Sequence, residues 1–307
     1  MKPSDRAEAE RLDAALRFFA ENDRPLPGIE SAARREAFVE HVLESIRRIR
    51  LIAILRTRDI SAHRADPRDL LFDPLKAAIH QQRQGNVEEA FWLLFLYVHF
   101  GKHKKAGWRY ARDVYGRLGE GGRWDWPSVS DDPAEFRAWL NARQAELANG
   151  KPRGFGNHRK RESLGGLGDK GTGAAVESYV RWVDPPRTHM AMIANSIREA
   201  NGDPGLAFDF LYRSMERVMR FGRLARFDYL TMAGKLELAP IQPGIAYIKG
   251  STGPLAGAKL LFGNGNATNL DEWVVQLAGR LRVGMQVMED SLCNWQKSPD
   301  KFKAFRG

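Results

Sequence analysis

Cysteine is nearly absent from the 307-residue chain, which contains only Cys293. A single cysteine excludes an internal disulfide and any zinc or iron–sulfur site built from several cysteines, and it is typical of the reducing cytoplasm. The histidines also lack the HExxH spacing of zinc hydrolases, so we expect neither a metal nor a cofactor.

Long apolar segments are missing as well. Residues 1–22 carry charges from the first turns and lack the apolar core of a signal peptide. The longest apolar run, residues 90–100, is far shorter than the ~20 residues that a membrane helix needs. We interpret this run as a buried core helix, and we expect a cytoplasmic protein without a membrane segment.

Positive charge is what the chain has in excess. Lys and Arg number 48 against 38 Asp and Glu, which gives a net charge of +10. The proportions of hydrophobic residues, 43%, and charged residues, 28%, are those of an ordinary globular protein and exclude a disordered chain. A positive surplus on a folded protein favours a polyanionic partner, and nucleic acid is the first to consider.

The spacing of apolar residues predicts helices nearly throughout. Near the start, Leu12, Ala15, Leu16 and Phe19 repeat at i, i+3, i+4 and i+7, which places them on one helix face. No run of alternating β-branched residues is long enough to predict a sheet. We therefore expect an all-α fold of roughly ten or more helices.

Helix start signals support this interpretation. Asn86 followed by Glu89 is typical of a capping arrangement, and the pairs Asp132-Pro133 and Asp203-Pro204 each place a capping carboxylate before a first-turn proline. Residues 151–173 break the pattern because they are rich in Gly, Lys and Arg. We expect an N-terminal helical layer over residues 1–150, a basic glycine-rich loop over 151–173, and a C-terminal helical unit over 174–307 that holds the active site.

An arginine stripe precedes a glycine turn in the C-terminal half. The expected helix before Gly222 carries arginines at i, i+4 and i+7, and two more follow the glycine: Arg213, Arg217, Arg220, Arg223 and Arg226. Guanidinium groups bind phosphates bidentately, and a glycine turn lets backbone N–H groups approach a phosphate. The alternative is a solvated basic face with Glu216 as a partner.

A second glycine turn opens a later helix. It contains Lys249, Gly250, Ser251, Thr252 and Gly253, and Lys259 follows within the helix. Backbone N–H groups, a helix N-terminus and a lysine can together bind an anion. A helix cap packed in a tight corner explains the same residues equally well.

Carboxylates near the C-terminus are candidates for acid–base chemistry. On a helix over residues 289–297, Asp290, Asn294 and Lys297 share one side and Glu289 lies on the neighbouring one. A surface arrangement of charges is the alternative. Asp271 starts another expected helix, where an aspartate is usually an N-cap.

Two basic patches lie next to aromatic residues. Residues 157–161 (NHRKR) follow Phe155, and residues 102–105 (KHKK) precede Trp108. Basic side chains interleaved with aromatic ones suit a nucleic-acid groove in which bases stack.

Four motifs in order resemble those of a known family. They are FGNHRK (155–160), FGRLARFDYL (221–230), YIKGSTGPLAGAKLLFG (247–263) and MEDSLCNWQKSP (288–299). In this order they are similar to the α-glutamyl/putrescinyl thymine pyrophosphorylase family, in particular its third clade, over most of the chain. The resemblance implies an all-helical fold related to helix–hairpin–helix DNA glycosylases, although the Gly-hydrophobic-Gly signature of that hairpin is absent.

The resemblance also implies a flipped base, a glycine turn that holds phosphate, and a carboxylate that supports base loss. If Gly222 is the turn, Arg223 and Arg226 hold phosphates and Asp228 enters the site; if Gly253 is the turn, Asp271 does. We expect a DNA glycosylase that excises a bulky modified pyrimidine, such as a glycosylated 5-hydroxymethylpyrimidine, in defence against phage DNA. The alternatives are a transferase that displaces pyrophosphate from activated 5-hydroxymethyluracil with an amine, and a plain DNA-binding module.

The predicted site residues fall into three groups, and DNA is the expected partner, with no obligate protein partner. The catalytic candidates are Asp228, Asp271, Glu289 and Lys249. The DNA-binding candidates are His158, Arg159, Lys160, Arg220, Gly222, Arg223, Arg226, Gly250, Ser251, Thr252, Gly253 and Lys259. The candidates for a base pocket are Phe155, Tyr229, Asp290, Asn294 and Trp295.

Overall fold

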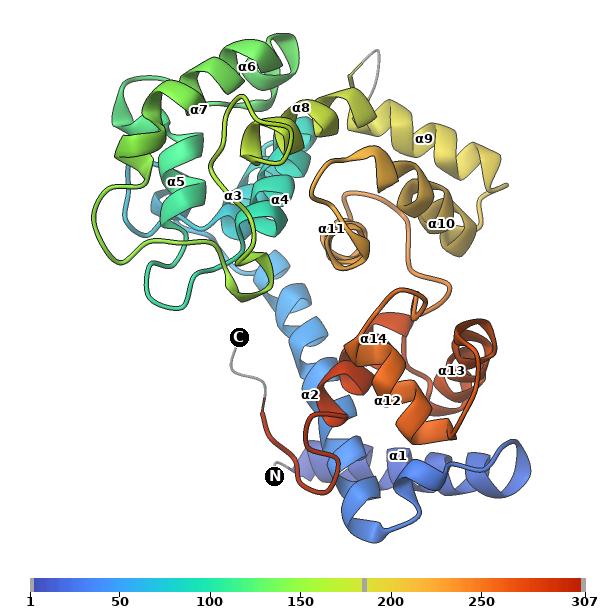
Figure 1. Ribbon diagram of the computed structural model, residues 1–307. Helices are drawn as coiled ribbons and strands as arrows, with labels where there is room; N and C mark the ends of the chain where they lie inside the picture. Colours follow the sequence, from blue (N-terminus) through green and yellow to red (C-terminus); the bar gives the residue numbers. More distant parts are fainter. Residues whose placement is uncertain (1–2, 184–186, 305–307) are drawn as a thin grey trace. The chain divides into compact units, whose positions relative to one another are not determined.

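The computed structural model describes residues 3–183 and 187–304, and their regular structure is helical (Figure 1). This part of the chain forms fourteen α-helices and five short 3₁₀ helices, without a strand. The only bridge of β type in it is isolated and joins His103 to Gly107. The all-α prediction is confirmed.

The chain divides into two compact units. The first comprises residues 1–54 and 243–306, and the second comprises residues 55–242. These bounds differ from the expected division near residues 150 and 174, because helices from the two ends of the chain pack on each other. Contacts between the first helix and α13 are of this kind.

The first unit contains five α-helices. They are α1 (Pro3–Asn22), most of α2 (Ala32–Thr57), α12 (Gly253–Phe262), α13 (Ala267–Leu281) and α14 (Met285–Trp295). Leu12, Leu16 and Phe19 of α1 are buried in its core, as their spacing predicts. Helices α12 and α14 pack closely, because a Cβ atom on Gly257 would lie 2.3 Å from the carbonyl oxygen of Leu292.

The second unit contains nine α-helices. They are α3 (Pro74–Arg83), α4 (Val87–Phe100), α5 (Arg109–Tyr115), α6 (Trp126–Asp131), α7 (Pro133–Leu147), α8 (Thr172–Val183), α9 (His189–Glu199), α10 (Pro204–Ser214) and α11 (Arg223–Lys235). Helix α4 is central to this unit, since α3, α5, α6, α9 and α11 all contact it. Its residues from Ala90 to Leu96 are all buried, which confirms the predicted core helix.

A helix that is apolar on every side must be covered on every side. Helix α4 meets this condition inside the second unit. Among the residues described, every helix falls short of the length and apolarity that crossing a bilayer requires.

Helix starts test the capping predictions directly. Asp132 accepts a hydrogen bond from the Glu135 amide, and Asp203 accepts one from the Leu206 amide, so both predicted caps are confirmed. Asn86 is the N-cap residue of α4, as predicted, but its side chain makes no capping hydrogen bond. The Asn86 side chain donates to the Gln81 side chain, and the Glu89 carboxylate turns to other partners.

Candidate nucleic-acid interface

The two compact units divide the predicted site residues between them. The second unit holds Phe155, His158, Arg159, Lys160, Arg220, Gly222, Arg223, Arg226, Asp228 and Tyr229. The first unit holds Lys249, Gly250, Ser251, Thr252, Gly253, Lys259, Asp271, Glu289, Asp290, Asn294 and Trp295.

In the second unit, two basic segments that are fifty residues apart in the sequence come together. The amide of Gly156 donates to the carbonyl oxygen of Phe100 at 2.8 Å, which fixes the glycine-rich loop to the C-terminal end of α4. A Cβ atom on Gly156 would lie 2.7 Å from the carbonyl carbon of Gly101. Glycine at residue 156 is thus required by the close approach of the two backbones.

This contact joins both predicted basic patches into one surface, which we call the basic surface. Its exposed members are Lys102, Lys104, Lys105, His158, Lys160 and Arg161. The turn that carries the three lysines is held from within, because Nδ1 of His103 accepts hydrogen bonds from the amides of Lys105 and Ala106. A fixed backbone beneath several exposed cations suits the phosphates of a nucleic acid.

Arg159 lies in the middle of the basic loop but points inward. Its Nε donates to the carbonyl oxygen of Val98 at 2.8 Å, at the end of α4. Its Nη2 lies 3.5 Å from Oδ2 of Asp228 on α11. The Arg159 side chain is 10% exposed and that of Asp228 is 41% exposed, so a buried cation here holds a carboxylate that is open to solvent.

Tyr97 on α4 lies close enough to Asp228 to be affected by its charge. Burial, and then the negative charges of Asp228 and Asp73, raise the pKa of the Tyr97 phenol to about 12. The phenol therefore stays protonated at any ordinary pH. The apolar pattern of α4 marks this tyrosine only as a core residue, so the sequence alone did not point to it.

The arginine stripe before Gly222 does not form. Helix α10 ends at Ser214, and Arg220 has a left-handed φ of 67°, so the expected helix does not reach it. The Arg220 guanidinium donates to both carboxylate oxygens of Glu162, at 2.6 and 3.2 Å. Its charge is used to hold the basic loop, and the prediction of a single guanidinium face over residues 213–226 is wrong.

Gly222 is the N-cap of α11, as expected for a glycine turn. The two arginines that follow it pack against aromatic rings, with Arg223 over Phe227 and Arg226 over Tyr212. The Arg226 side chain is only 12% exposed and also donates to the carbonyl oxygen of Tyr212. The geometry gives Arg226 a packing role, while Arg223 keeps part of its surface open.

The two aromatic candidates of this unit lie in its core. The Phe155 ring is stacked on Phe100 at 5.5 Å, and Phe155 is 8% exposed. Tyr229 is 1% exposed, and its hydroxyl is hydrogen-bonded to the hydroxyl of Tyr179 at 2.8 Å. Neither ring offers an open face for a base in this structure.

In the first unit, the glycine turn before α12 is built as a helix cap. The Ser251 hydroxyl donates to the Ile248 carbonyl oxygen and accepts a hydrogen bond from the Leu255 amide. A Cβ atom on Gly253 would lie 2.7 Å from Sγ of Cys293, so this glycine permits close packing on α14. Lys249 and Lys259 are exposed, and Gly250 has a φ of 76°.

Asp271 is not a helix cap, because α13 begins four residues earlier with Asn266 as its N-cap. Both carboxylate oxygens of Asp271 instead accept from the Ile248 amide, at 3.2 and 3.1 Å. Asp271 is 7% exposed. Its carboxylate thus secures the segment that precedes the glycine turn.

The remaining candidates lie on α14. Asp290 pairs with Arg48 at 3.2 Å and accepts from the Asn294 amide, and Lys297 donates to Asn294, so this face forms as predicted. Glu289 is 7% exposed. Trp295 is fully buried and contacts Phe38 edge-on, which leaves no ring face for a base.

Sequence reasoning missed a polar network that crosses the core of the second unit. His189, which is fully buried, is hydrogen-bonded through Nδ1 to Glu88 at 2.6 Å and through Nε2 to the Tyr179 hydroxyl. Tyr179 continues the network to Tyr229 on α11. Glu88 lies in the first turn of α4, where acidic residues are common in any helix. Nothing in the sequence spacing indicates that its partner is 101 residues away.

Histidines give no metal site in the described part of the chain. His99 and His103 are four residues apart, but α4 ends between them and they face different partners, Thr172 for His99 and two backbone amides for His103. Burial, and then the charges of Arg159 and Arg220, lower the pKa of His99 to about 3, so it stays neutral. No group of three or more His, Cys, Asp or Glu side chains gathers among the described residues.

Comparison with known proteins gives one family. The family model described as alpha-glutamyl/putrescinyl thymine pyrophosphorylase clade 3 matches residues 33–307. No curated protein and no solved structure matches the chain. The match includes the basic surface, Asp228 and both glycine turns, and its family name denotes enzymes that act on modified thymine. The chain belongs to the α-glutamyl/putrescinyl thymine pyrophosphorylase family, clade 3.

Proposed function

We propose that the chain is a DNA glycosylase that excises a bulky modified pyrimidine, with Asp228 as its catalytic carboxylate. One observation carries the proposal: an open carboxylate lies 3.5 Å from a buried guanidinium within a surface of exposed cations. Asp228 also lies on the helix that follows the Gly222 turn. Among the carboxylate candidates, Asp271 and Glu289 are each 7% exposed, which favours Asp228 as the group that meets a substrate.

The basic surface would hold the sugar–phosphate backbone on either side of the target nucleotide. Extruding a base costs a few kcal/mol, and contacts between exposed lysines and phosphates can offset that cost. Lys102, Lys104, Lys105 and Lys160 have the exposure for this role. A surface that binds backbone alone would accept many sequences, so selectivity would rest on the modified base.

The chemistry would be hydrolysis of the N-glycosidic bond. As the bond between C1′ and the base nitrogen breaks, the bonding pair leaves with the base, which then takes up a proton, and positive charge develops on the sugar. An ionised Asp228 would stabilise this charge and accept a proton from the water that adds to C1′, as carboxylates do in glycoside hydrolysis. Arg159 would keep the carboxylate ionised and fixed in place.

The test compares two aspartates that lie on the neighbouring helices α10 and α11. Each of them is paired with an arginine. Asp228→Asn is the test variant, and Asp209→Asn on α10, where Asp209 pairs with Arg213 at 2.8 Å, is the matched control. DNA that carries glycosylated 5-hydroxymethylpyrimidines is incubated with each protein and treated with alkali, which cuts the strand at abasic sites. We expect Asp228→Asn to lower the rate at least ~100-fold, as expected for loss of a catalytic acid–base group, while DNA binding remains.

Equal losses in both variants, or loss of binding together with activity in Asp228→Asn, would assign Asp228 a structural role. Excision that needs Glu289 or Asp271 instead would move the site to the first unit. A lysine nucleophile would give a different product, because Lys249 attacking C1′ would form an imine that borohydride traps on the protein.

A second function is favoured by the family match itself, because that name denotes a pyrophosphorylase of modified thymine. In this alternative the enzyme is a transferase, and an amine displaces pyrophosphate from activated 5-hydroxymethyluracil in DNA. Gain of an amine adduct with release of pyrophosphate, and no abasic sites, would establish the transferase and exclude the glycosylase. If excision is the reaction, defence against phages with modified DNA is the biological role that we propose.

A further inference from the structure

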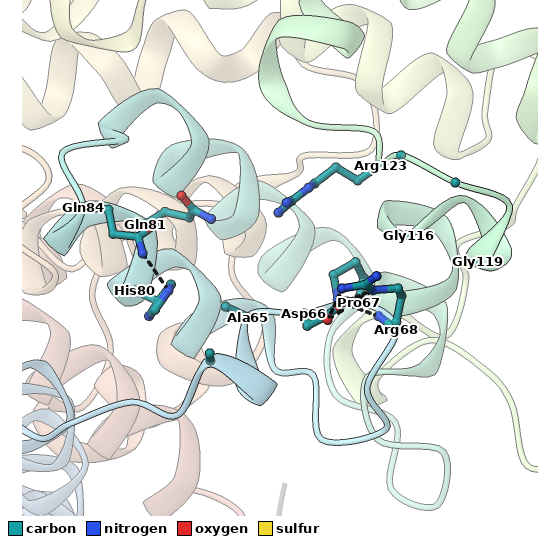
Figure 2. Close-up of a pocket in the computed structure, with 13 residues that line it drawn as sticks. Ala65, Asp66, Pro67, Arg68, His80, Gln81, Gln84, Gly116, Gly119 and Arg123 are labelled. Carbon is teal, nitrogen blue, oxygen red and sulfur yellow. Dashed lines mark hydrogen bonds and ion pairs between the residues drawn. The ribbon is translucent and has the colours of Figure 1, made fainter.

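Two cavities that the proposed function does not use lie beside the C-terminal end of α3, and the second of them also borders the N-terminal end of α4. One has a volume of about 520 Å³ and the other of about 650 Å³. Gln81, Gln84 and Arg123 line both of them. Figure 2 shows the first cavity, with the Arg123 side chain extending between Gln81 on one side and Pro67 on the other.

The carboxylates that line these cavities already have partners. Asp66 pairs with Arg68 at 2.8 Å, and Asp125 caps α6 by accepting from the Ser128 amide and hydroxyl. Glu88 accepts from the His189 and Met190 amides and bonds to the His189 ring. Glu89 accepts from the Trp126 amide and the Tyr115 hydroxyl, so each lining carboxylate already has a partner in the protein.

Arg123 is the arginine that lines both cavities. Its nearest hydrogen-bond partner is the Tyr115 hydroxyl, at the long distance of 3.5 Å from Nη1. Among the described residues, no carboxylate lies within ion-pair distance of its guanidinium. The charges of Glu89 and Asp125 act on the Arg123 guanidinium only from beyond ion-pair distance. A guanidinium that borders a cavity in this way can donate two parallel hydrogen bonds to an oxyanion.

The glycine-rich turn that directly precedes Arg123 forms part of the wall of the first cavity. Gly119, Gly121 and Gly122 all have left-handed φ values, of 85°, 85° and 70°. A Cβ atom on any of the three would meet nothing within 4 Å, so these glycines border open space. A left-handed glycine turn leaves backbone N–H groups accessible to a ligand, which is a common way to bind phosphate.

We propose that these cavities bind a small phosphate ester of nucleotide size, with its phosphate group on Arg123. Each volume falls within the range of about 300–1,000 Å³ that small-molecule sites occupy. The site is separate from the basic surface, because the 14 residues of α4 at about 1.5 Å each place roughly 20 Å between the two ends of the helix. A free small molecule therefore fits the cavity better than a DNA backbone phosphate, which shares the same chemistry.

The test uses adenosine monophosphate as the probe and calorimetry as the measurement. Arg123→Gln is expected to weaken binding roughly tenfold or more, as loss of a charge-assisted hydrogen-bond pair does. The matched control is Arg117→Gln, which removes the same charge from the same turn, where Arg117 packs over Trp124 and does not line either cavity. The control is expected to keep the affinity of the wild-type protein.

Further measurements distinguish a free nucleotide from a DNA backbone phosphate as the ligand. Arg123→Gln should leave binding of duplex DNA unchanged; a matching loss of DNA affinity would place a backbone phosphate in the cavity and overturn the proposal. Absence of adenosine monophosphate binding at millimolar concentration, or tighter binding of malonate, would also overturn it. Arg123→Lys keeps the charge and loses the bidentate geometry, so its reduced affinity tests the proposal even if the glutamine variant does not fold.

Discussion

The two ends of α4 arrange the same types of charge in opposite ways. At the C-terminal end, the arginine is buried and the carboxylate is open, since Arg159 is 10% exposed and Asp228 is 41% exposed. At the N-terminal end, Glu88 and Glu89 are bound by donors from the protein, and Arg123 extends into a cavity (Figure 2). The charged group that stays accessible at each end of the helix, a carboxylate or a guanidinium, determines what that end can bind.

Net charge is therefore a poor guide to where a protein binds its ligands. Both ends lie in the same unit of a chain with a net charge of +10. One end offers a carboxylate among surface cations, which suits chemistry on bound DNA, and the other offers an exposed guanidinium at the edge of two cavities, which suits a small anion. The predictions below test this contrast, beginning with the largest expected effect on stability.

Glu89→Gln should abolish a pH dependence of stability that the N-terminal end of α4 causes. Burial raises the pKa of Glu89 from 4.5 to about 7, despite hydrogen bonds from the Trp126 amide and the Tyr115 hydroxyl. The folded protein therefore holds this proton more tightly than the unfolded chain, and stability falls as pH rises from 4.5 to 7. Relative to Glu89→Gln, the wild-type protein should lose about 3 kcal/mol over this range, measured by urea unfolding.

Glu88→Gln is the matched control, and its sign is opposite. Burial acts to raise the pKa of Glu88, but its hydrogen bonds and pairing with His189 outweigh burial and lower it. The stability that Glu88 contributes is present above pH 4.5 and is lost as pH falls through its lower folded value. The deficit of Glu88→Gln should thus be largest at pH 8 and shrink in acid, and equal pH profiles for both variants would refute the assignment.

Tyr179→Phe tests whether the two ends of α4 are connected. The Tyr179 hydroxyl joins His189, which bonds to Glu88 at one end, to Tyr229, which is next to Asp228 in α11. Removing it leaves buried polar groups without partners, so the free energy of unfolding should fall by about 1–3 kcal/mol.

The control for that variant is Tyr110→Phe, because the Tyr110 hydroxyl makes no hydrogen bond to the part of the chain that the structure describes. Unfolding in urea should show a change below about 0.5 kcal/mol for it. The excision rate of Tyr179→Phe is measured under conditions in which the variant is fully folded. A changed rate would show that the two ends of α4 are coupled, and an unchanged rate would show that they act independently.

Lys160→Gln should change the salt dependence of DNA binding more than the affinity itself. If Lys160 contacts one phosphate, the slope of log K against log salt should become shallower by about 1. Arg68→Gln, in the loop that lines the first cavity, removes an arginine whose side chain is 80% exposed, and its slope should equal that of the wild-type protein. Fluorescence anisotropy with a labelled duplex gives both slopes, and equal changes would mean that charge anywhere on this unit suffices.

The sequence predicted the fold class and several local features well. Periodicity was enough to identify the core helix at residues 90–100 and the buried face of α1, because these depend on neighbours within the same helix. Asp132 and Asp203 cap their helices for the same local reason. The family resemblance is confirmed by the match over residues 33–307.

Features that depend on distant partners could not be predicted. The expected stripe of arginines required a helix through Arg220, whereas the bidentate contact with Glu162 turns that residue inward. Glu89 looked like part of a cap, but its donors come from Tyr115 and Trp126. Nothing in the spacing of Asp228 and Arg159 indicates that they meet, since helix packing alone brings α11 to the basic loop.

The contact between Gly101 and Gly156 has a consequence for how DNA affinity can be controlled. Backbone carbonyl and amide groups hold the basic loop there, together with van der Waals contact, and none of these titrates or is screened by ions. Salt would screen the exposed cations of the surface, and in part the Arg220–Glu162 pair that also holds the loop, while this backbone contact stays in place. Counter-ions screen the cations of the basic surface, so ionic strength can tune the affinity for DNA over a wide range. The backbone of the loop keeps its place, and the register of the bound strand then stays the same.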